Sequence, residues 1–219
     1  MTLTIKLVRH GESEANLGNV DPQVVGEHGI PLSAAGQQQA LTVGAALGPD
    51  FLREALVYTS PYLRARQTLD GILAGSGLPT ETVAAMRRYE DPRLREVEHG
   101  YDPLASQDAL RKTHGWFYYR YRGGESPADC FDRTSNFLES MMRQIERHQA
   151  ERALVVTHGL TIRCFVMRFL HLRVEDFDRL ENPGNCQVIT LGDQATIGES
   201  AFVDGWWGVN GLRLRPPEP

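Results

Sequence analysis

Two histidines in this sequence stand in the same short setting, each one residue beyond an apolar run and directly before a glycine. His10 lies in the run VRHG and His158 in the run VTHG. A neutral imidazole nitrogen is a nucleophile near neutral pH. Arg9, directly before the first histidine, adds a fixed positive charge whose planar fork suits the oxygens of a phosphoryl group. The shared setting separates these two histidines from the other five in the chain.

The apolar runs before both histidines predict strands over residues 3–8 and 153–157. In an open α/β sheet the ligand site lies outside the carboxyl ends of the strands. We therefore expect His10 and His158 to meet across one pocket, although 148 positions separate them (158 minus 10).

Helices and further strands alternate with these two strands along the chain. Their alternation predicts an α/β fold, a three-layer α/β/α sandwich with a mostly parallel central sheet. The predicted helices cover residues 37–47, 62–73, 126–148 and 161–170, and the other predicted strands cover residues 55–59 and 187–191. The sequence RPPEP at the end of the chain predicts no regular structure.

The length of 219 residues predicts a single domain over residues 1–219. Residues from about 90 to 125 contain many arginines and aromatics with little periodicity, which predicts a helical and loop cap insert that shapes a substrate cleft. Within the cap insert, the preferred interpretation of the run WFYYRYR at residues 116–122 is contact with the organic part of a ligand, and packing alone is the alternative. Base stacking by this run is disfavoured because the chain is acidic overall.

Composition narrows the classes of partner. The net charge of −5 gives no reason to expect nucleic acid or an anionic membrane, and no apolar run approaches the ~20 residues of a membrane span. The first residues become charged too early for a signal peptide. The three cysteines form no CxxC pair, which argues against disulfides and structural zinc and favours buried free thiols at Cys130 and Cys164. These features predict a cytoplasmic protein.

The stretch LVRHGESEAN at residues 7–16 resembles the signature of the histidine phosphatase superfamily, also called phosphoglycerate mutase-like. Four further blocks follow in the family's order and span most of the chain: LSAAGQQQA at 32–40, SPYLRARQT at 60–68, LREVEHG at 94–100 and VTHG at 156–159. On these blocks the chain is identified as a member of the superfamily.

The resemblance implies a site for phosphoryl transfer. His10 is the predicted nucleophile, which forms a phosphohistidine while a backbone carbonyl fixes its tautomer. Arg9 and Arg64 clamp the phosphoryl oxygens, and His158 donates a further hydrogen bond. The predicted phosphate-binding residues are Arg9, Ser13, Asn16, Arg64, His158, Gly159 and Leu160, with the amides of the last pair opening a helix.

The leaving alkoxide needs a proton from a carboxylic acid. Glu96 fits the family's E-x-x-x-G arrangement with Gly100, and Glu98 and Glu90 are the alternatives. After the alcohol leaves, the same carboxylate activates the water that cleaves the phosphohistidine.

The acid block also bears on which activity to expect. Glycolytic mutases resemble E-R-H-Y-G-x-L-x-G here, whereas this chain reads EVEHGYD at residues 96–102. The chain resembles the phosphatase-like branch, which implies a metal-independent phosphomonoesterase, a histidine acid phosphatase-type hydrolase with no cofactor and no metal. The alternatives are a phosphoglycerate mutase-type phosphotransferase and a non-catalytic phosphate-binding protein. The expected partner is a small-molecule phosphate ester, and the family resemblance is compatible with a homo-oligomer.

Overall fold

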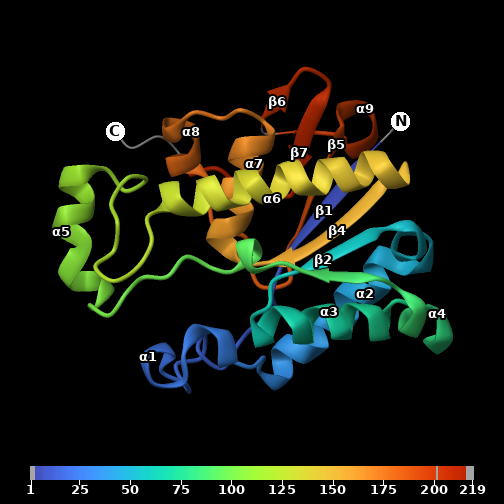
Figure 1. The fold of residues 1–219 in the computed structure, drawn as a ribbon, viewed down its shortest axis with the longest axis horizontal. Helices are drawn as coiled ribbons and strands as arrows, with labels where there is room; N and C mark the ends of the chain where they lie inside the picture. Colours follow the sequence, from blue (N-terminus) through green and yellow to red (C-terminus); the bar gives the residue numbers. More distant parts are fainter. Residues whose placement is uncertain (1–2, 201, 216–219) are drawn as a thin grey trace.

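The computed structural model describes residues 3–200 and 202–215 of the chain. Within them, seven strands form one sheet in the order β3-β2-β4-β1-β5-β7-β6 (Figure 1). The strands are β1 (Thr4–Arg9), β2 (Leu56–Thr59), β3 (Arg88–Glu90), β4 (Arg152–Thr157), β5 (Val188–Asp193), β6 (Val203–Asp204) and β7 (Trp207–Asn210). The predicted disorder of RPPEP falls almost wholly on residues outside the described ranges.

The four strands β3, β2, β4 and β1 are parallel to one another. The strands β5, β7 and β6 continue the sheet beyond β1, and each is antiparallel to its neighbour. The predicted α/β class with a mostly parallel central sheet is confirmed. The antiparallel extension is a feature that the sequence did not predict.

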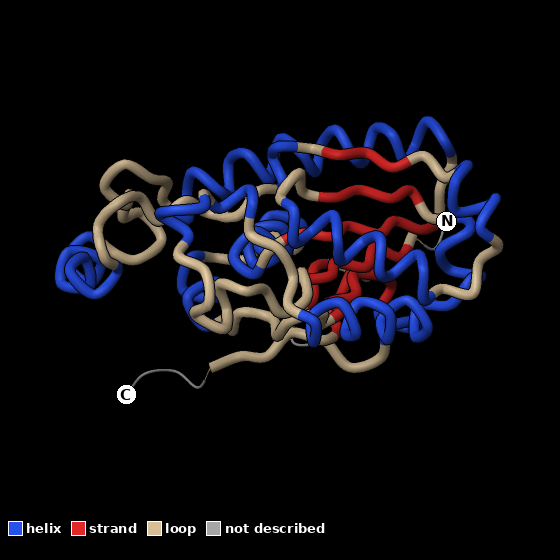
Figure 2. The backbone as a smooth tube through the Cα atoms, turned by 90° about the horizontal axis from the view of Figure 1, so that it is seen from below, coloured by secondary structure: helices blue, strands red, loops and turns tan. Residues whose placement is uncertain are grey.

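Helices cover both faces of the sheet, and Figure 2 shows the strands between them. The pair α2 (Ala34–Glu54) and α3 (Leu63–Gly75) packs on one face, and α6 (Pro127–His148) and α7 (Gly159–Phe169) pack on the other. The shorter helices are α1 (Pro22–Val25), η1 (Glu27–Gly29), α4 (Thr80–Ala85), η2 (Pro92–Leu94), α5 (Leu104–His114), α8 (Val174–Arg179) and α9 (Gln194–Ile197).

Capping residues set where the long helices begin. Ser126 and Asp129 form a reciprocal capping box at the start of α6, because each side chain accepts a hydrogen bond from the other residue's backbone N–H. Ser33 caps α2 by accepting from the N–H of Gly36 at 3.0 Å. The expected end of α2 at Gly48 is a kink instead: Gly48 has φ 73°, and helical structure resumes at Pro49.

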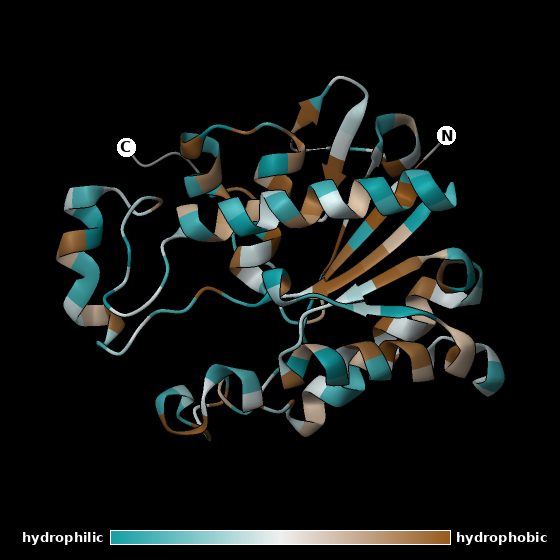
Figure 3. Ribbon diagram, in the orientation of Figure 1, coloured by the Kyte–Doolittle hydropathy of each residue, from teal (hydrophilic) through white to brown (hydrophobic). Residues whose placement is uncertain are grey.

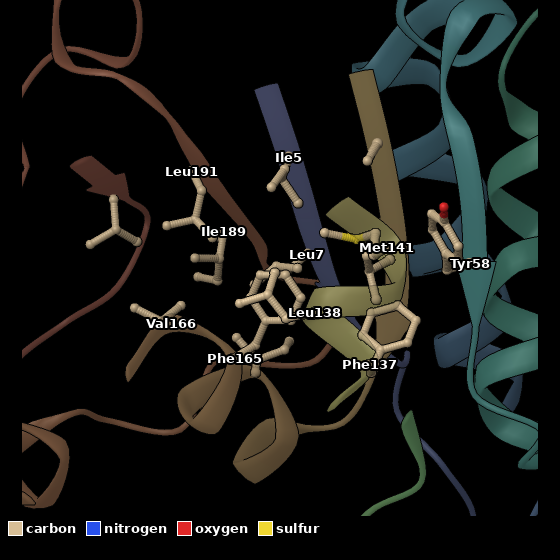
Figure 4. Close-up of a cluster of buried hydrophobic side chains, with 14 of the residues drawn as sticks. Ile5, Leu7, Tyr58, Phe137, Leu138, Met141, Phe165, Val166, Ile189 and Leu191 are labelled. Atoms are coloured by element: carbon tan, nitrogen blue, oxygen red, sulfur yellow. The ribbon is translucent and has the colours of Figure 1, made fainter. Parts of the chain in front are cut away.

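Alternate residues of the central strands point to opposite faces and so build two cores. On β1, Ile5 and Leu7 pack against α6 and α7 together with Phe137 and Phe165, as Figure 4 shows. Val8 points to the other face, where α2 and α3 pack. Much of the length of the central strands is hydrophobic, as the brown stretches in Figure 3 show.

Residues 91–125 include α5, which extends away from the sheet layers in Figure 2, and they add three buried residues to a third cluster that also draws on α6, α7 and α8. In the run at 116–122, Phe117 and Tyr121 are buried, whereas Tyr118 is 63% exposed. The packing interpretation is therefore confirmed for Phe117 and Tyr121, which lie in a cluster with Cys130 and Phe177.

The expectation of buried free thiols is also confirmed, since Cys130 and Cys164 are both buried and neither forms a disulfide. Among the described helices, none has the length and apolarity needed to cross a membrane.

Candidate active site

His10 and His158 follow directly on two neighbouring parallel strands. The last paired residues of β1 and β4 are Arg9 and Thr157, so the next residue of each strand lies at the same edge of the sheet. The two imidazole rings are 5.2 Å apart between centroids, and both are buried, at 4% and 0% exposure. The expectation that these histidines meet is confirmed.

The hydrogen bonds of His10 assign its tautomer. Nδ1 lies 2.7 Å from the carbonyl oxygen of Gly11, which only accepts, so Nδ1 carries the proton. Nε2 therefore holds a lone pair, and Arg64 Nε donates to it at 3.3 Å. Burial, reinforced by the charges of Arg64 and Arg9, lowers the pKa of His10 to about 3, although the Gly11 carbonyl opposes the change. The imidazole is thus neutral over the whole physiological range.

His158 is held by the residue that follows a third strand of the parallel group. Its Nε2 lies 2.8 Å from Oγ of Ser60, directly after β2, and Tyr62 packs edge-on against the ring. Burial, then the positive charge of Arg64, lowers the pKa of His158 well below its ordinary value. Its Nδ1 is buried without a hydrogen-bond partner in the described parts of the chain, so its hydrogen-bonding capacity is unused.

The two arginines approach the histidines from different elements. Arg9 ends β1 and donates from Nη1 to the carbonyl of Pro183 at 2.7 Å, while its Nε is buried with no partner among the described residues. Arg64 lies in the first turn of α3, where it is 4% exposed. Its Nη1 donates to the carbonyl oxygen of Glu27 at 2.6 Å, and its Nη2 pairs with the Glu27 carboxylate at 2.8 Å.

The loop after His10 is closed by Asn16. Its Oδ1 accepts from the backbone N–H of Ser13 at 3.1 Å and from the Ser13 hydroxyl at 3.0 Å. Asn185, in the loop that precedes β5, donates to the same Oδ1 and to the carbonyl oxygen of His10, both at 3.2 Å. The Ser13 hydroxyl is therefore committed to the loop, and the NH₂ end of Asn16 is the end left for a ligand.

Glu96 lies against the first turn of α7. Its carboxylate accepts from the N–H of Val97 at 3.0 Å and of Leu160 at 3.4 Å, and Thr161 Oγ1 lies 3.4 Å away. The N-terminus of a helix stabilises a negative charge, which explains this placement. The amide of Leu160 thus faces Glu96, and the adjacent Gly159 begins the helix beside Arg9.

The competing acids are placed differently. The side chain of Glu98 is 50% exposed and lies 3.9 Å from Arg95. Glu90 is exposed at the end of β3. The geometry therefore agrees with Glu96 as the acidic residue of the site.

Three residues of the site were not predicted from the sequence: Glu27, Ser60 and Asn185. Ser60 follows a parallel strand, so the rule that found His10 and His158 also applies to it. Asn185 comes before a strand, and an antiparallel strand begins at the edge where its parallel neighbour ends. Glu27 lies in a short helix between two loops, where sequence periodicity gives no signal.

Within residues 3–200 and 202–215, no three His, Cys, Asp or Glu side chains are arranged to hold a metal ion.

The model of the histidine phosphatase superfamily (branch 1) matches residues 5–196. The chain belongs to the histidine phosphatase superfamily. The matched range contains every site residue named above.

Relatives in this superfamily carry names of two kinds. A phosphoglycerate mutase-like protein of Arabidopsis thaliana is 36% identical over 84% of this chain, and this chain spans 63% of that relative's length. A broad-range acid phosphatase of Saccharomyces cerevisiae is 26% identical over 85% of this chain and 84% of its own. Phosphatases and phosphoglycerate mutase-like proteins are therefore both similar to this member of the superfamily.

A solved structure confirms the fold of this superfamily member. The mycobacterial glucosyl-3-phosphoglycerate phosphatase in complex with VO3 superposes with a TM-score of 0.69 over 97% of each chain, at 23% identity.

Proposed function

We propose that this chain is a metal-independent phosphomonoesterase that works through a phosphohistidine on His10. The observation that carries the proposal is the tautomer of His10. Its proton is held on Nδ1 by the Gly11 carbonyl, and its Nε2 lone pair faces Arg64 and the ring of His158. A neutral nucleophile beside two buried cationic or polar donors suits attack on phosphorus.

In the first step, Nε2 of His10 attacks the phosphorus atom and the bond from phosphorus to the ester oxygen breaks. Arg9 and Arg64 offset the charge on the phosphoryl oxygens. Arg9 Nε and His158 Nδ1 are buried and unpartnered in the described chain, so both are free to act on those oxygens. Asn16 adds the NH₂ end of its amide.

In its protonated form, Glu96 supplies the proton that the departing alkoxide requires, and the start of α7 stabilises the carboxylate that remains. The backbone N–H of Leu160, two residues after His158, lies 3.4 Å from this carboxyl group, which supports a position next to the phosphate-binding residues. In the second step a water attacks the phosphohistidine, Glu96 accepts the proton, and His10 Nε2 is released as phosphate leaves. After this step Glu96 is protonated again and His10 Nε2 again carries a free lone pair, as before the first step.

The test is phosphate release by the chelated protein from p-nitrophenyl phosphate and from a panel of natural monoesters, with 2-phosphoglycerate formation from 3-phosphoglycerate followed in parallel. We expect release that survives chelation and falls at least a thousandfold in His10→Ala. A ³²P label from substrate remains on the wild-type protein in alkali and leaves it in acid, as a phosphoramidate does.

Two other results lead to different functions. Interconversion of phosphoglycerate isomers without net phosphate release would make the chain a mutase. This alternative is retained because a phosphoglycerate mutase-like protein is among its relatives. Phosphate binding without either reaction makes it a binding protein. Unchanged turnover in His10→Ala refutes the nucleophile.

A further inference from the structure

Glu27 places a carboxylate on the very guanidinium that is proposed to clamp the phosphoryl group. We propose that Glu27 sets the substrate class, disfavouring esters with a second anionic group near the phosphate and favouring esters of uncharged alcohols. This inference rests on one part of the proposed function, that a phosphate monoester binds beside His10. It does not require that the ester is hydrolysed.

The position of the carboxylate follows from the contacts of Arg64. Arg64 Nε reaches His10 Nε2, while Nη1 and Nη2 reach the backbone oxygen and carboxylate of Glu27. One guanidinium group therefore separates the negative charge of Glu27 from the nucleophilic nitrogen. The Arg64 side chain is 5% exposed and that of Glu27 is 32% exposed, so the carboxylate closes the arginine off from solvent. A phosphate that contacts both Arg64 and His10 therefore lies within one guanidinium group of the Glu27 carboxylate.

Apart from Arg64, the neighbours of Glu27 described below do not offset its charge. His99 is a candidate counter-charge, but burial lowers its pKa more than the nearby carboxylates of Glu96 and Glu27 raise it, so the ring is neutral. Burial, then the charges of Glu98 and Glu27, raises the pKa of Tyr62 to about 12, which keeps the phenol uncharged. The surroundings of Glu27 are thus acidic or neutral on the side away from Arg64.

Three arginines of the 91–125 segment are already paired with carboxylates of the same segment. Arg95 pairs with Glu125, Arg111 lies 2.8 Å from Asp108, and Arg122 lies 3.4 Å from Asp102. A second anionic group on a ligand has to compete with these acids for a cation. This pairing strengthens the preference that Glu27 imposes.

The segment that carries Glu27 also contacts the 91–125 segment. Gln23 Nε2, in α1, donates to the carbonyl oxygen of Tyr101 at 2.9 Å. Both α1 and α5 lie at the end of the molecule toward which the parallel strands run (Figure 1). Residues 23–27 are therefore held on one side by Arg64, through Glu27, and on the other by the 91–125 segment, through Gln23.

The test compares two esters that differ in one group. Glycerol 3-phosphate and 3-phosphoglycerate share the phosphate and the adjacent carbons, and 3-phosphoglycerate carries a carboxylate where the other has a hydroxymethyl group. Their dissociation constants are measured by calorimetry on His10→Ala, which prevents turnover, and on His10→Ala combined with Glu27→Gln. Glu54→Gln in the same background is the control, because Glu54 also pairs with an arginine but does so at Arg152, at the opposite end of β4.

We expect Glu27→Gln to improve binding of 3-phosphoglycerate relative to glycerol 3-phosphate by about tenfold, as removal of one like charge several ångströms away predicts. Glu54→Gln leaves the ratio unchanged. A ratio that Glu27→Gln does not alter, or failure of both esters to bind, overturns the inference. Wild-type phosphate release is scored separately: a shifted ratio without any turnover refutes the proposed function and leaves the role of Glu27 standing.

Discussion

His10 and His158 are both buried imidazoles, yet their hydrogen bonds differ in kind. A carbonyl fixes the proton of His10 on Nδ1, whereas the hydroxyl of Ser60 both donates and accepts, so it leaves the tautomer of His158 to the ligand. The types and spacing of Arg9, His10 and His158 were enough to predict that they meet. Glu27 was not predictable, because its contact with Arg64 joins residues 37 apart through a loop.

Acidification provides a test at the scale of His10. An unfolded histidine has a pKa of about 6.5, and the folded value is about 3, so between these values the unfolded chain binds a proton that the native chain does not. Native stability therefore falls as the pH drops through this window, by up to about 1.4 kcal/mol per pH unit for one such histidine. His158 acts with the same sign.

Urea unfolding between pH 7 and 4.5 measures this slope. His10→Asn should reduce the slope by about one proton relative to wild type. The control His148→Asn removes an exposed histidine at the end of α6 and should leave the slope nearly unchanged. An identical slope in His10→Asn and wild type contradicts the assignment of a neutral, buried His10.

At the scale of elements, long and strongly patterned segments were predictable and short polar ones were not. The strands β1, β2 and β4 and the helices α3, α6 and α7 lie within two residues of their expected bounds. The strands β3 and β6 have three and two residues, too few to show alternation. The direction of β5 could not be predicted from the sequence either, because an apolar run looks the same in a strand that pairs parallel and in one that pairs antiparallel.

Helix α2 supports the His10 loop by close backbone contact. A Cβ atom added at Gly36 would lie 2.0 Å from the carbonyl oxygen of Glu12, two residues after His10. Gly36→Ala must therefore push the loop away from the helix, and we expect a loss of roughly 2–4 kcal/mol of stability together with most phosphate release. Chemical unfolding and the phosphate assay measure both effects.

Gly29→Ala is the matched control for this substitution. Its added Cβ would lie 3.6 Å from Val25, an ordinary contact, so stability should change little. Full activity in Gly36→Ala shows that the loop position is not set by α2.

At the scale of the whole molecule, the antiparallel extension is joined to the parallel half by a shared core. Val209 on β7 is 1% exposed and packs in the cluster of Ile5, Leu7 and Phe165. The parallel half carries both histidines, and the loop before β5 adds Asn185 to them. The extension therefore belongs to the same cooperative unit as the site.

A Val→Ala substitution at each of two positions tests whether the extension and the parallel half unfold together. Val209→Ala should cost about 2 kcal/mol because it leaves a cavity in the shared core, whereas Val203→Ala, at a side chain 52% exposed on β6, should cost little. Both variants should unfold in urea in a single transition. The slope of the free energy of unfolding against urea concentration should equal that of the wild type. A separate early transition in Val209→Ala would show that the extension unfolds independently.

The central place of β1 has a consequence for biosynthesis. Strand β1 leaves the ribosome before β4, whose first residue, Arg152, follows Arg9 by 143 positions (152 minus 9), and also before β5, which pairs on its other side. At roughly 5–20 residues per second, β1 stays without its sheet partners for roughly 7–30 seconds. During that time Ile5, Leu7 and Val8 are an unpaired apolar strand, the kind of segment that chaperones shield. The site is thus complete only after the loop carrying Asn185 has emerged.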